Sequence, residues 1–135
     1  MSAVGVLTNQ TILIIEDDAL IRENLEELLS EKYEVIACSG GRVGLEVALR
    51  EKPDLVICDV TMAGVTGYNV LTEIRSNPAT AKIPFIFLTA LASKDDWRLG
   101  MELGADDYLT KPYTRKELFN AIAARLKRFD SEPTN

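Results

Sequence analysis

The sequence predicts an α/β fold in which a doubly wound sheet of five parallel strands is covered by helices on both faces. The first observation behind this prediction is that short apolar runs alternate five times with longer segments of helical periodicity. The second is that the apolar runs are nearly continuous, as in parallel strands that are buried on both faces. Right-handed crossovers between such strands favour the strand order 2-1-3-4-5.

The first strand is predicted at Ile12–Ile15, and a helix over Ala19–Glu31 follows it with Asp18 at the capping position. Apolar residues recur along this helix at the spacing of one buried face, namely Leu20, Ile21, Leu25, Leu28 and Leu29. A second strand, Tyr33–Cys38, precedes a helix over Arg42–Arg50. The side chains of that helix expected to point inward are Val43, Val47 and Ala48.

The third strand, Leu55–Cys58, is followed by a loop with two glycines and a helix over Tyr68–Ser76, which Asn77-Pro78 ends. The remaining strands are predicted at Phe85–Leu88 and Tyr108–Thr110. The last two helices each open with a capping box and run to about Leu103 and Arg128; the boxes are Ser93 with Asp96 and Thr114 with Glu117. Gly104 suits the position just after the earlier of these helices.

Length and composition indicate one globular domain. The chain has 135 residues, of which 47% are hydrophobic and 27% charged, and its net charge of −6 argues against direct nucleic-acid binding. No apolar stretch approaches the roughly 20 residues of a membrane span, and the first residues lack signal-peptide features. A cytoplasmic location without membrane association is therefore expected. The chain contains no histidine, which excludes a phosphohistidine or an imidazole metal site on it.

The two cysteines, Cys38 and Cys58, follow neither a zinc-binding nor a redox spacing. In the predicted strand order a third strand lies between theirs, which places them about 9–10 Å apart. This distance is too long for a disulfide, so both cysteines are expected to be buried apolar residues.

Polar residues stand at the ends of four of the apolar runs. Glu16-Asp17-Asp18 follows the first predicted strand, and Asp59 follows the third. Thr89 follows the fourth and Lys111 the fifth. In an open parallel sheet, the carboxyl ends of the strands form the crevice where ligands bind. Because the first and third strands are neighbours in the predicted order, the acid cluster is expected beside Asp59.

The acid cluster predicts a divalent cation. A single carboxylate at a helix N-terminus is often only a favourable loop acid. Three acids in a row after a buried strand, however, repel one another unless a cation is present. Mg²⁺ prefers few carboxylates, several waters and phosphate oxygens. Asp17 is the expected direct ligand, whereas Asp18 is assigned mainly to helix capping.

Asp59 is interpreted as a phosphoryl acceptor, because the residues after it offer neither an arginine partner nor a helix N-terminus. Its carboxylate would face the metal on one side and Lys111 on the other, and its attack on phosphorus would give an acyl phosphate. Thr89-Ala90 brings a small hydroxyl and an unhindered backbone N–H to the same crevice. Pro112 fixes the turn that directs Lys111 inward.

These residues belong to motifs that resemble the receiver (REC) domain of two-component response regulators. The matching segments are Ile12–Asp18, Leu55–Asp59, Phe87–Ala90 and Gly104–Tyr113, within a resemblance that covers Thr11–Lys127. The resemblance implies the flavodoxin-like receiver fold and a phosphorylation-activated switch of a phosphorelay. Asp59 would accept its phosphoryl group from a histidine kinase, a histidine phosphotransfer protein or a small phosphodonor.

The resemblance also implies a ligand set. Mg²⁺, with Mn²⁺ as an alternative, would be held by Glu16, Asp17, Asp59 and the backbone carbonyl of Thr61, with Glu16 acting through water. The phosphoryl group would be bound by Thr61, Ala90 and Lys111. Such a domain would catalyse only its own Mg²⁺-dependent phosphorylation and slow dephosphorylation, and would otherwise not act as an enzyme.

Two residues are implied as the switch. Thr89 would move toward the phosphoryl group, and Tyr108 would turn inward behind it. These movements would shift the surface formed by the fourth helix, fifth strand and fifth helix, which would control an output domain or protein. The resemblance further implies a cis Lys111–Pro112 peptide bond.

Three positions depart from the family pattern. The loop Met62–Gly67 lacks the proline and the acid that the family often has there, although no catalytic group is lost. Leu91 and Thr61 flank the path of the water that would hydrolyse the acyl phosphate, and the apolar Leu91 predicts slow self-dephosphorylation. Ala121 stands where winged-helix regulators often carry an arginine, which weakens the inference of their dimer. A phosphorylation-dependent homodimer is left open.

Three other interpretations were weighed. A phosphohydrolase of the haloacid-dehalogenase type uses similar residues, but Asp59-Val60-Thr61 lacks its second acid. A pseudo-receiver that is never phosphorylated is disfavoured by the intact acid, hydroxyl and lysine set. A flavodoxin-like redox protein is disfavoured because no Ser/Thr/Gly-rich phosphate loop follows the first strand.

The chain is divided into an N-terminal extension (residues 1–10), a receiver domain (11–128) and a flexible tail or start of a linker (129–135). No DNA-binding or catalytic module follows the last predicted helix. The chain is therefore either a stand-alone receiver or the N-terminal part of a longer protein, and both readings stay open. The cognate kinase and the output do not follow from the sequence.

Overall fold

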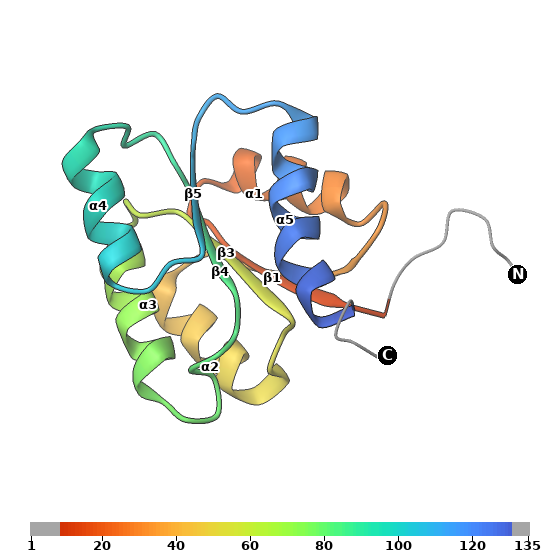
Figure 1. Cartoon of the computed structure of the whole chain (residues 1–135), viewed down its shortest axis with the longest axis horizontal. Helices are drawn as coiled ribbons and strands as arrows, with labels where there is room; N and C mark the ends of the chain where they lie inside the picture. The colour runs from red at the N-terminus through yellow and green to blue at the C-terminus, as the bar shows by residue number, and fades with distance from the viewer. Residues whose placement is uncertain (1–8, 131–135) are drawn as a thin grey trace, which may run out of the picture.

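Five parallel strands form one sheet in the computed structural model, in the order β2-β1-β3-β4-β5 (Figure 1). The doubly wound α/β fold predicted from the sequence is confirmed. The structure describes the backbone of residues 9–130 and the side chains of residues 9–126, so most of the expected extension and tail lies outside it. The strands are β1 (Thr11–Ile15), β2 (Glu34–Cys38), β3 (Leu55–Cys58), β4 (Phe85–Thr89) and β5 (Asp107–Thr110). The helices are α1 (Ala19–Leu29), α2 (Gly41–Glu51), α3 (Gly67–Ser76), α4 (Lys94–Glu102) and α5 (Arg115–Asp130).

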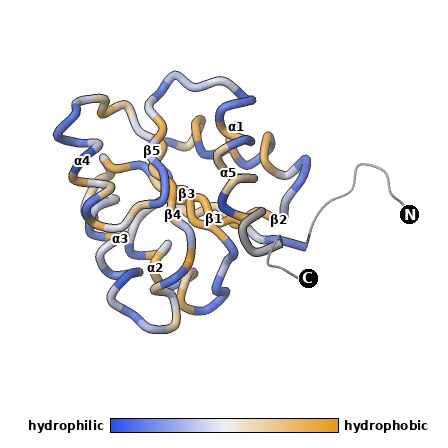
Figure 2. Tube along the Cα trace, in the orientation of Figure 1, coloured by the Kyte–Doolittle hydropathy of each residue, from blue (hydrophilic) through white to orange (hydrophobic). Residues whose placement is uncertain are grey.

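The helices cover both faces of the sheet. α1 and α5 lie on one face, and α2, α3 and α4 lie on the other (Figure 1). Figure 2 shows that the hydrophobic residues concentrate in the strands between these layers. Along β1, Ile12 and Ile14 belong to one core cluster, whereas Leu13 and Ile15 belong to the other. Because successive side chains pack into different cores, the strand sequences are apolar throughout.

The helices begin and end close to the predicted capping residues. Asp18 Oδ1 and Ser93 Oγ each accept the backbone N–H of the third residue after them, at 3.0 Å. Thr114 and Glu117 form the predicted capping box, with hydrogen bonds of 3.0 and 2.9 Å. Gly104 follows α4 with φ of +110°, a conformation that favours glycine. The residues predicted to begin and end each element lie within about two positions of the observed ones.

Two predictions of buried side chains were wrong. Leu20 is 67% exposed, because it lies about 140° around the helix from the buried Leu25 at the 100° per residue of an α-helix. Val43 is 49% exposed, because Gly44 takes the inward position next to it. A Cβ atom at Gly44 would lie 2.4 Å from Cδ1 of Ile15, so α2 packs against β1 more closely than any side chain allows.

Arg75 joins several segments at the amino-terminal end of the sheet. Its guanidinium donates to the carbonyl of Gly104 through Nε at 3.1 Å and Nη2 at 2.8 Å. Nη1 donates to the carbonyls of Ala81 at 3.1 Å and Ile83 at 2.7 Å. Nη2 also pairs with Oδ2 of Asp106 at 3.0 Å. One side chain of α3 therefore connects the segments before β4 and β5, and nothing in the sequence pattern had singled it out.

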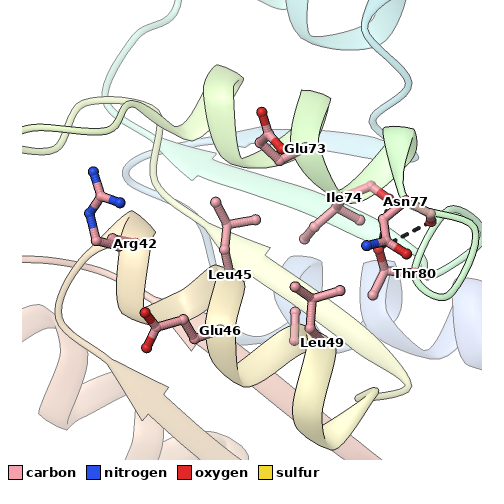
Figure 3. A pocket seen from close by; sticks show the side chains of 9 residues that line it. Arg42, Leu45, Glu46, Leu49, Glu73, Ile74, Asn77 and Thr80 are labelled. Carbon is pink, nitrogen blue, oxygen red and sulfur yellow. Dashed lines mark hydrogen bonds between the residues drawn. The ribbon is translucent and has the colours of Figure 1, made fainter.

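A cavity of about 240 Å³ lies between α2 and α3, away from the ends of the strands (Figure 3). Its lining includes Arg42, Leu45, Glu46, Leu49, Glu73, Ile74, Asn77 and Thr80. The buried Thr80 hydroxyl donates to the carbonyl of Ile74 at 2.8 Å. The hydroxyl of Thr80 is therefore not an unpaired polar group facing the cavity.

The two cysteines lie as the sequence predicted. Cys38 and Cys58 are free and buried, and their strands pair with opposite edges of β1. Within the described part of the chain, no helix is both long and apolar enough to cross a membrane.

Candidate phosphoacceptor site

The carboxyl ends of the central strands bring three charged side chains together. Lys111 Nζ lies 3.1 Å from Oδ2 of Asp59 and 3.3 Å from Oε1 of Glu16. These residues follow β5, β3 and β1, and the last two strands are neighbours at the point where the strand order reverses. The sequence prediction that acids and a lysine meet there matches this arrangement.

Two of the three groups are largely withdrawn from solvent. The side chain of Glu16 is 5% exposed, that of Asp59 11% and that of Lys111 21%. Burial raises the pKa of Glu16, and the nearby charge of Asp59 raises it further. Burial acts to lower the pKa of Lys111, but the hydrogen bond and charge of Asp59, together with Glu16, more than offset it and raise that pKa. The site thus holds two carboxylates against one ammonium group.

Three hydrogen bonds fix the backbone around these acids. Asp59 Oδ1 accepts the N–H of Thr61 at 3.2 Å, and Glu16 Oε2 accepts the N–H of Asp18 at 3.1 Å. Arg22 on α1 donates through Nη1 to the carbonyl of Glu16 at 2.9 Å. One oxygen of the Asp59 carboxylate is thus bonded to the backbone of the following loop and the other to Lys111.

Asp17 lies at the edge of the site rather than in the lysine cluster. Its side chain is exposed, and Oδ2 accepts the N–H of Ala63 at 3.1 Å, which ties the loop after β1 to the loop after β3. Sequence reasoning did not foresee this partner, since it lies 46 residues away and contributes only its backbone. Among the described residues, no three Asp, Glu, His or Cys side chains are close enough to hold a metal ion alone.

The predicted switch residues meet at one backbone unit. Thr89 is buried, and its Oγ1 accepts the N–H of Leu91 at 3.2 Å. Tyr108 donates its hydroxyl to the carbonyl of the same Leu91 at 2.9 Å. Its side chain is buried, so the ring lies inward in this structure. Ala90 between them is exposed beside the crevice.

The turn after β5 directs the lysine into the site. The Lys111–Pro112 peptide bond is cis, as the resemblance implied. The backbone N–H of Lys111 donates to the carbonyl of Thr89 at 2.8 Å, which fixes the start of this turn against the end of β4. The hydroxyl of Thr89 and the ammonium of Lys111 consequently come from adjacent strand ends.

The family model of the response regulator receiver domain matches residues 12–123 of this chain. The chain therefore belongs to the response regulator receiver family of two-component signalling. The match covers four strands in full, all of β1 but Thr11, and the site described above.

Curated relatives and solved structures agree with this assignment. Proteins described as probable transcriptional regulator ycf27 are 41% identical over 130 residues in Porphyridium aerugineum and 43% identical over 126 residues in Guillardia theta. These alignments cover 96% and 93% of this chain but 53% and 48% of the relatives. The chain thus spans about half the length of the curated relatives it matches.

Among solved structures, a putative response regulator from Chloroflexus aurantiacus has a TM-score of 0.84 and 35% identity, covering 90% of this chain and 100% of its own. The receiver domain of sensor histidine kinase PA1611 from Pseudomonas aeruginosa has a TM-score of 0.82 and 29% identity, covering 89% and 99%. The latter is described with a magnesium ion coordinated in its active site cleft.

Proposed function

We propose that this chain is a phosphorylation-activated switch whose phosphoryl acceptor is Asp59. The observation that carries the proposal is the position of Lys111 Nζ, 3.1 Å from Oδ2 of Asp59, at the carboxyl end of β3. An ammonium group there neutralises charge that develops on the phosphoryl oxygens as the carboxylate attacks. The domain acts on itself in this reaction and does not turn over an external substrate.

The transfer step balances without any further reactant. One oxygen of the Asp59 carboxylate forms a bond to phosphorus, while the bond from phosphorus to the donor's histidine nitrogen breaks. The electron pair of that bond stays on the imidazole, which then takes up a proton. With acetyl phosphate as donor, the phosphorus–oxygen bond breaks and acetate leaves.

The residues present fit a Mg²⁺ ion. Glu16 and Asp59 place two carboxylates against a single lysine, which leaves an excess of negative charge at the crevice. Asp17 adds a carboxylate at its edge, and the carbonyl of Thr61 completes the proposed protein ligands. Mg²⁺ binds through few carboxylates with several waters, which suits a site without three converging acids. When bound, the ion would neutralise phosphoryl oxygens; Mn²⁺ is a second candidate.

Thr61, Ala90 and Lys111 are the proposed phosphoryl-binding groups, and Thr89 with Tyr108 is the proposed switch. Thr61 and Ala90 are both exposed. They stand in the loops after β3 and β4, at the same end of the sheet as Asp59, so their backbone N–H groups are candidates to bind the phosphoryl oxygens. Thr89 gives up its bond from the N–H of Leu91 if its hydroxyl moves toward the phosphoryl group. Such a movement changes the same backbone unit that Tyr108 holds.

A phosphorelay protein is the proposed donor. A groove of about 350 Å³ beside the site is lined by Ile21, Asn24, Leu25, Leu28, Lys111, Pro112 and Tyr113. It reaches from the α1 surface to the lysine, and the exposed Leu20 on α1 adds apolar surface nearby. A donor bound along α1 would therefore present its phosphohistidine at Asp59. We propose that this phosphotransfer takes place in the cytoplasm.

The output is proposed to be a domain or protein that reads the α4-β5-α5 surface. The receiver unit is assigned to residues 11–128, flanked by an extension and by a tail or linker. The curated relatives are about twice the length of the matched region, which supports an output domain in the same protein for at least those relatives. A phosphorylation-dependent homodimer stays a prediction.

Mass spectrometry after incubation with acetyl phosphate and Mg²⁺ tests the proposal. The native chain is expected to gain the mass of one phosphoryl group, and Asp59→Asn none. An equal gain in both chains would reject Asp59 as the acceptor, and no gain in the native chain would favour a pseudo-receiver. Sustained release of phosphate from a generic phosphate ester would instead favour the phosphohydrolase.

A further inference from the structure

Two tyrosines from different elements hold the segment that leads into α4. Tyr68, on the first turn of α3, donates its hydroxyl to the carbonyl of Asp96 at 3.3 Å. Tyr108, on β5, donates to the carbonyl of Leu91 at 2.9 Å. Leu91 lies before α4 and Asp96 lies in its first turn. The start of α4 is therefore attached at one point to β5 and at a second point to α3.

The two tyrosine rings both pack against Phe87, and besides burial a side-chain hydrogen bond between them influences the pKa of each tyrosine. Tyr68 and Phe87 meet edge to face with ring centroids 5.5 Å apart, and Phe87 and Tyr108 do so at 5.7 Å. Gly100 of α4 lies directly on this cluster, since a Cβ there would be 3.0 Å from Cδ2 of Tyr108 and 3.3 Å from Cδ2 of Phe87. Burial raises the pKa of both tyrosines, and Tyr68 also contributes to the raised pKa of Tyr108. A displacement of Tyr68 would therefore disturb the contacts of both α4 and Tyr108.

The start of α3 is in turn packed on the backbone of the phosphoryl acceptor. A Cβ atom at Gly67 would lie 2.1 Å from the carbonyl oxygen of Asp59 and 2.8 Å from Cα of Val60. The N–H of Gly67 donates to the carbonyl of Val60 at 2.8 Å. At the start of the loop that ends at Gly67, the N–H of Thr61 donates to Oδ1 of Asp59. A new group on that carboxylate competes for this N–H and so acts on the loop.

We propose that Tyr68 is a positioning residue that couples the state of Asp59 to α4 by a route that does not pass through Thr89. The route runs from Asp59 through the loop to Gly67 and from there through the Tyr68 hydroxyl to Asp96. It rests on the proposed function, because it presumes that Asp59 is phosphorylated. Thr89 and Tyr108 form the other route, through Leu91. Tyr68 touches neither the phosphoryl group nor the metal, so it affects the response and not the chemistry.

The fluorescence of Trp97 can be used to measure this coupling. It is the only tryptophan of the chain, it follows Asp96, and it is 49% exposed on α4. Its fluorescence and the hydrogen exchange of the α4 amides can be followed before and after treatment with acetyl phosphate and Mg²⁺. The variants are Tyr68→Phe, Thr89→Ala and the double variant. Tyr33→Phe is the matched control, since it removes a hydroxyl from the opposite core.

Tyr68→Phe is expected to take up one phosphoryl group, as the native chain does, while at least half of the phosphorylation-dependent change at Trp97 is lost. Without acetyl phosphate, exchange of the α4 amides should accelerate roughly fivefold, the equivalent of one neutral hydrogen bond. Thr89→Ala should keep part of the response, and the double variant should lose it. Tyr33→Phe should respond like the native chain.

Two results would overturn the inference. One is a Tyr68→Phe response equal to that of Tyr33→Phe at equal phosphorylation. The other is a native chain whose α4 changes neither its fluorescence nor its exchange when Asp59 is phosphorylated. Failure of the proposed function looks different, because then no variant with an intact Asp59 gains a phosphoryl group.

Discussion

Each end of the sheet pairs a cation with an acid, but the two cations differ in whether they also bind backbone carbonyls. At the amino-terminal end, the Arg75 guanidinium makes hydrogen bonds to three backbone carbonyls as well as to Asp106. Asp106 itself also accepts the N–H of Phe85 at 2.8 Å. At the carboxyl end, the ammonium of Lys111 hydrogen-bonds, among the residues that the structure describes, to the carboxylates of Glu16 and Asp59.

This difference follows from the chemistry of the two side chains. A guanidinium has five N–H donors in a rigid plane, so Arg75 can satisfy several loops at once and fixes their relative positions. An ammonium is a compact charge on a flexible stem, so Lys111 neutralises nearby oxygens without enclosing them. The first arrangement suits a structural link between loops, whereas the second pairs the carboxylate of Asp59, the proposed phosphoryl acceptor, with a single flexible cation.

The largest expected effect comes from breaking the structural end. Arg75→Met should lower the free energy of unfolding by about 3 kcal/mol, because it leaves three part-buried carbonyls without their donor and removes the cation that faces Asp106. Urea unfolding measures the change. The control Arg50→Met removes an exposed ion pair and should change stability by less than about 0.5 kcal/mol. Similar losses in the two variants would contradict the structural role of Arg75.

Breaking the reactive end should cost less stability. Lys111→Met leaves Glu16 facing Asp59 without a cation and should lower the free energy of unfolding by only about 1 kcal/mol in EDTA, because Glu16, whose pKa burial already raises, can take up a proton instead. Mg²⁺ should then stabilise this variant more than the native chain, because it replaces the missing positive charge. Urea unfolding with and without Mg²⁺ checks this, and an equal gain in both chains would argue against a metal ion beside Lys111.

A smaller effect is expected on the lifetime of the acyl phosphate. Leu91 stands two residues after Thr89 and packs, half-buried, against the core that contains Tyr108. The resemblance to receivers puts this position beside the path of the hydrolytic water, so Leu91→Asn should admit an ordered water and speed phosphate loss roughly fivefold, about 1 kcal/mol in the barrier. The rate is followed by mass spectrometry after removal of acetyl phosphate. Leu99→Asn, the same change on the exposed side of α4, is the control. Equal rates of phosphate loss in the two variants would contradict a role for Leu91 in protecting the acyl phosphate.

The smallest effect is a pH dependence. Folding raises the pKa of Glu16 above its ordinary 4.5, chiefly through burial, so the folded chain binds this proton more readily than the unfolded chain. Ionisation of Glu16 therefore costs stability as the pH rises from 4.5 through the folded pKa. Glu16→Gln should be more stable than the native chain at pH 7 in EDTA, and the gain should vanish below pH 4.5. Glu46→Gln, on the exposed side of α2, should show no such trend.

The sequence predicted the strand order, the helix caps and the meeting of Glu16, Asp59 and Lys111. These features follow from local patterns, since continuous apolar runs mark parallel strands and each run ends at the same edge of the sheet. The predictions that Leu20 and Val43 are buried were wrong. Leu20 lies outside the face of α1 that Leu25 and Leu29 bury. In α2, the close approach of Gly44 to Ile15 decides which face is buried, and Val43 lies beside that face.

The remaining features depend on backbone groups far away in the chain, and these leave no pattern in side-chain types. The N–H of Ala63 that binds Asp17 and the carbonyls that bind Arg75 are of this kind. The carbonyl of Asp96 that accepts the Tyr68 hydroxyl is another. In each case the polar side chain was visible in the sequence, but its partner became visible only in the folded chain.

Locating the phosphoryl group among the 21 acidic residues tests the central claim most directly. Borohydride converts the acyl phosphate of an aspartate to an alcohol, so peptide mass mapping after acetyl phosphate treatment identifies the modified residue. The comparison of the two ends predicts modification of Asp59 alone, with Asp106 unmodified in its network with Arg75. Modification of Asp17 or Asp106, or a spread over several acids, would contradict the account.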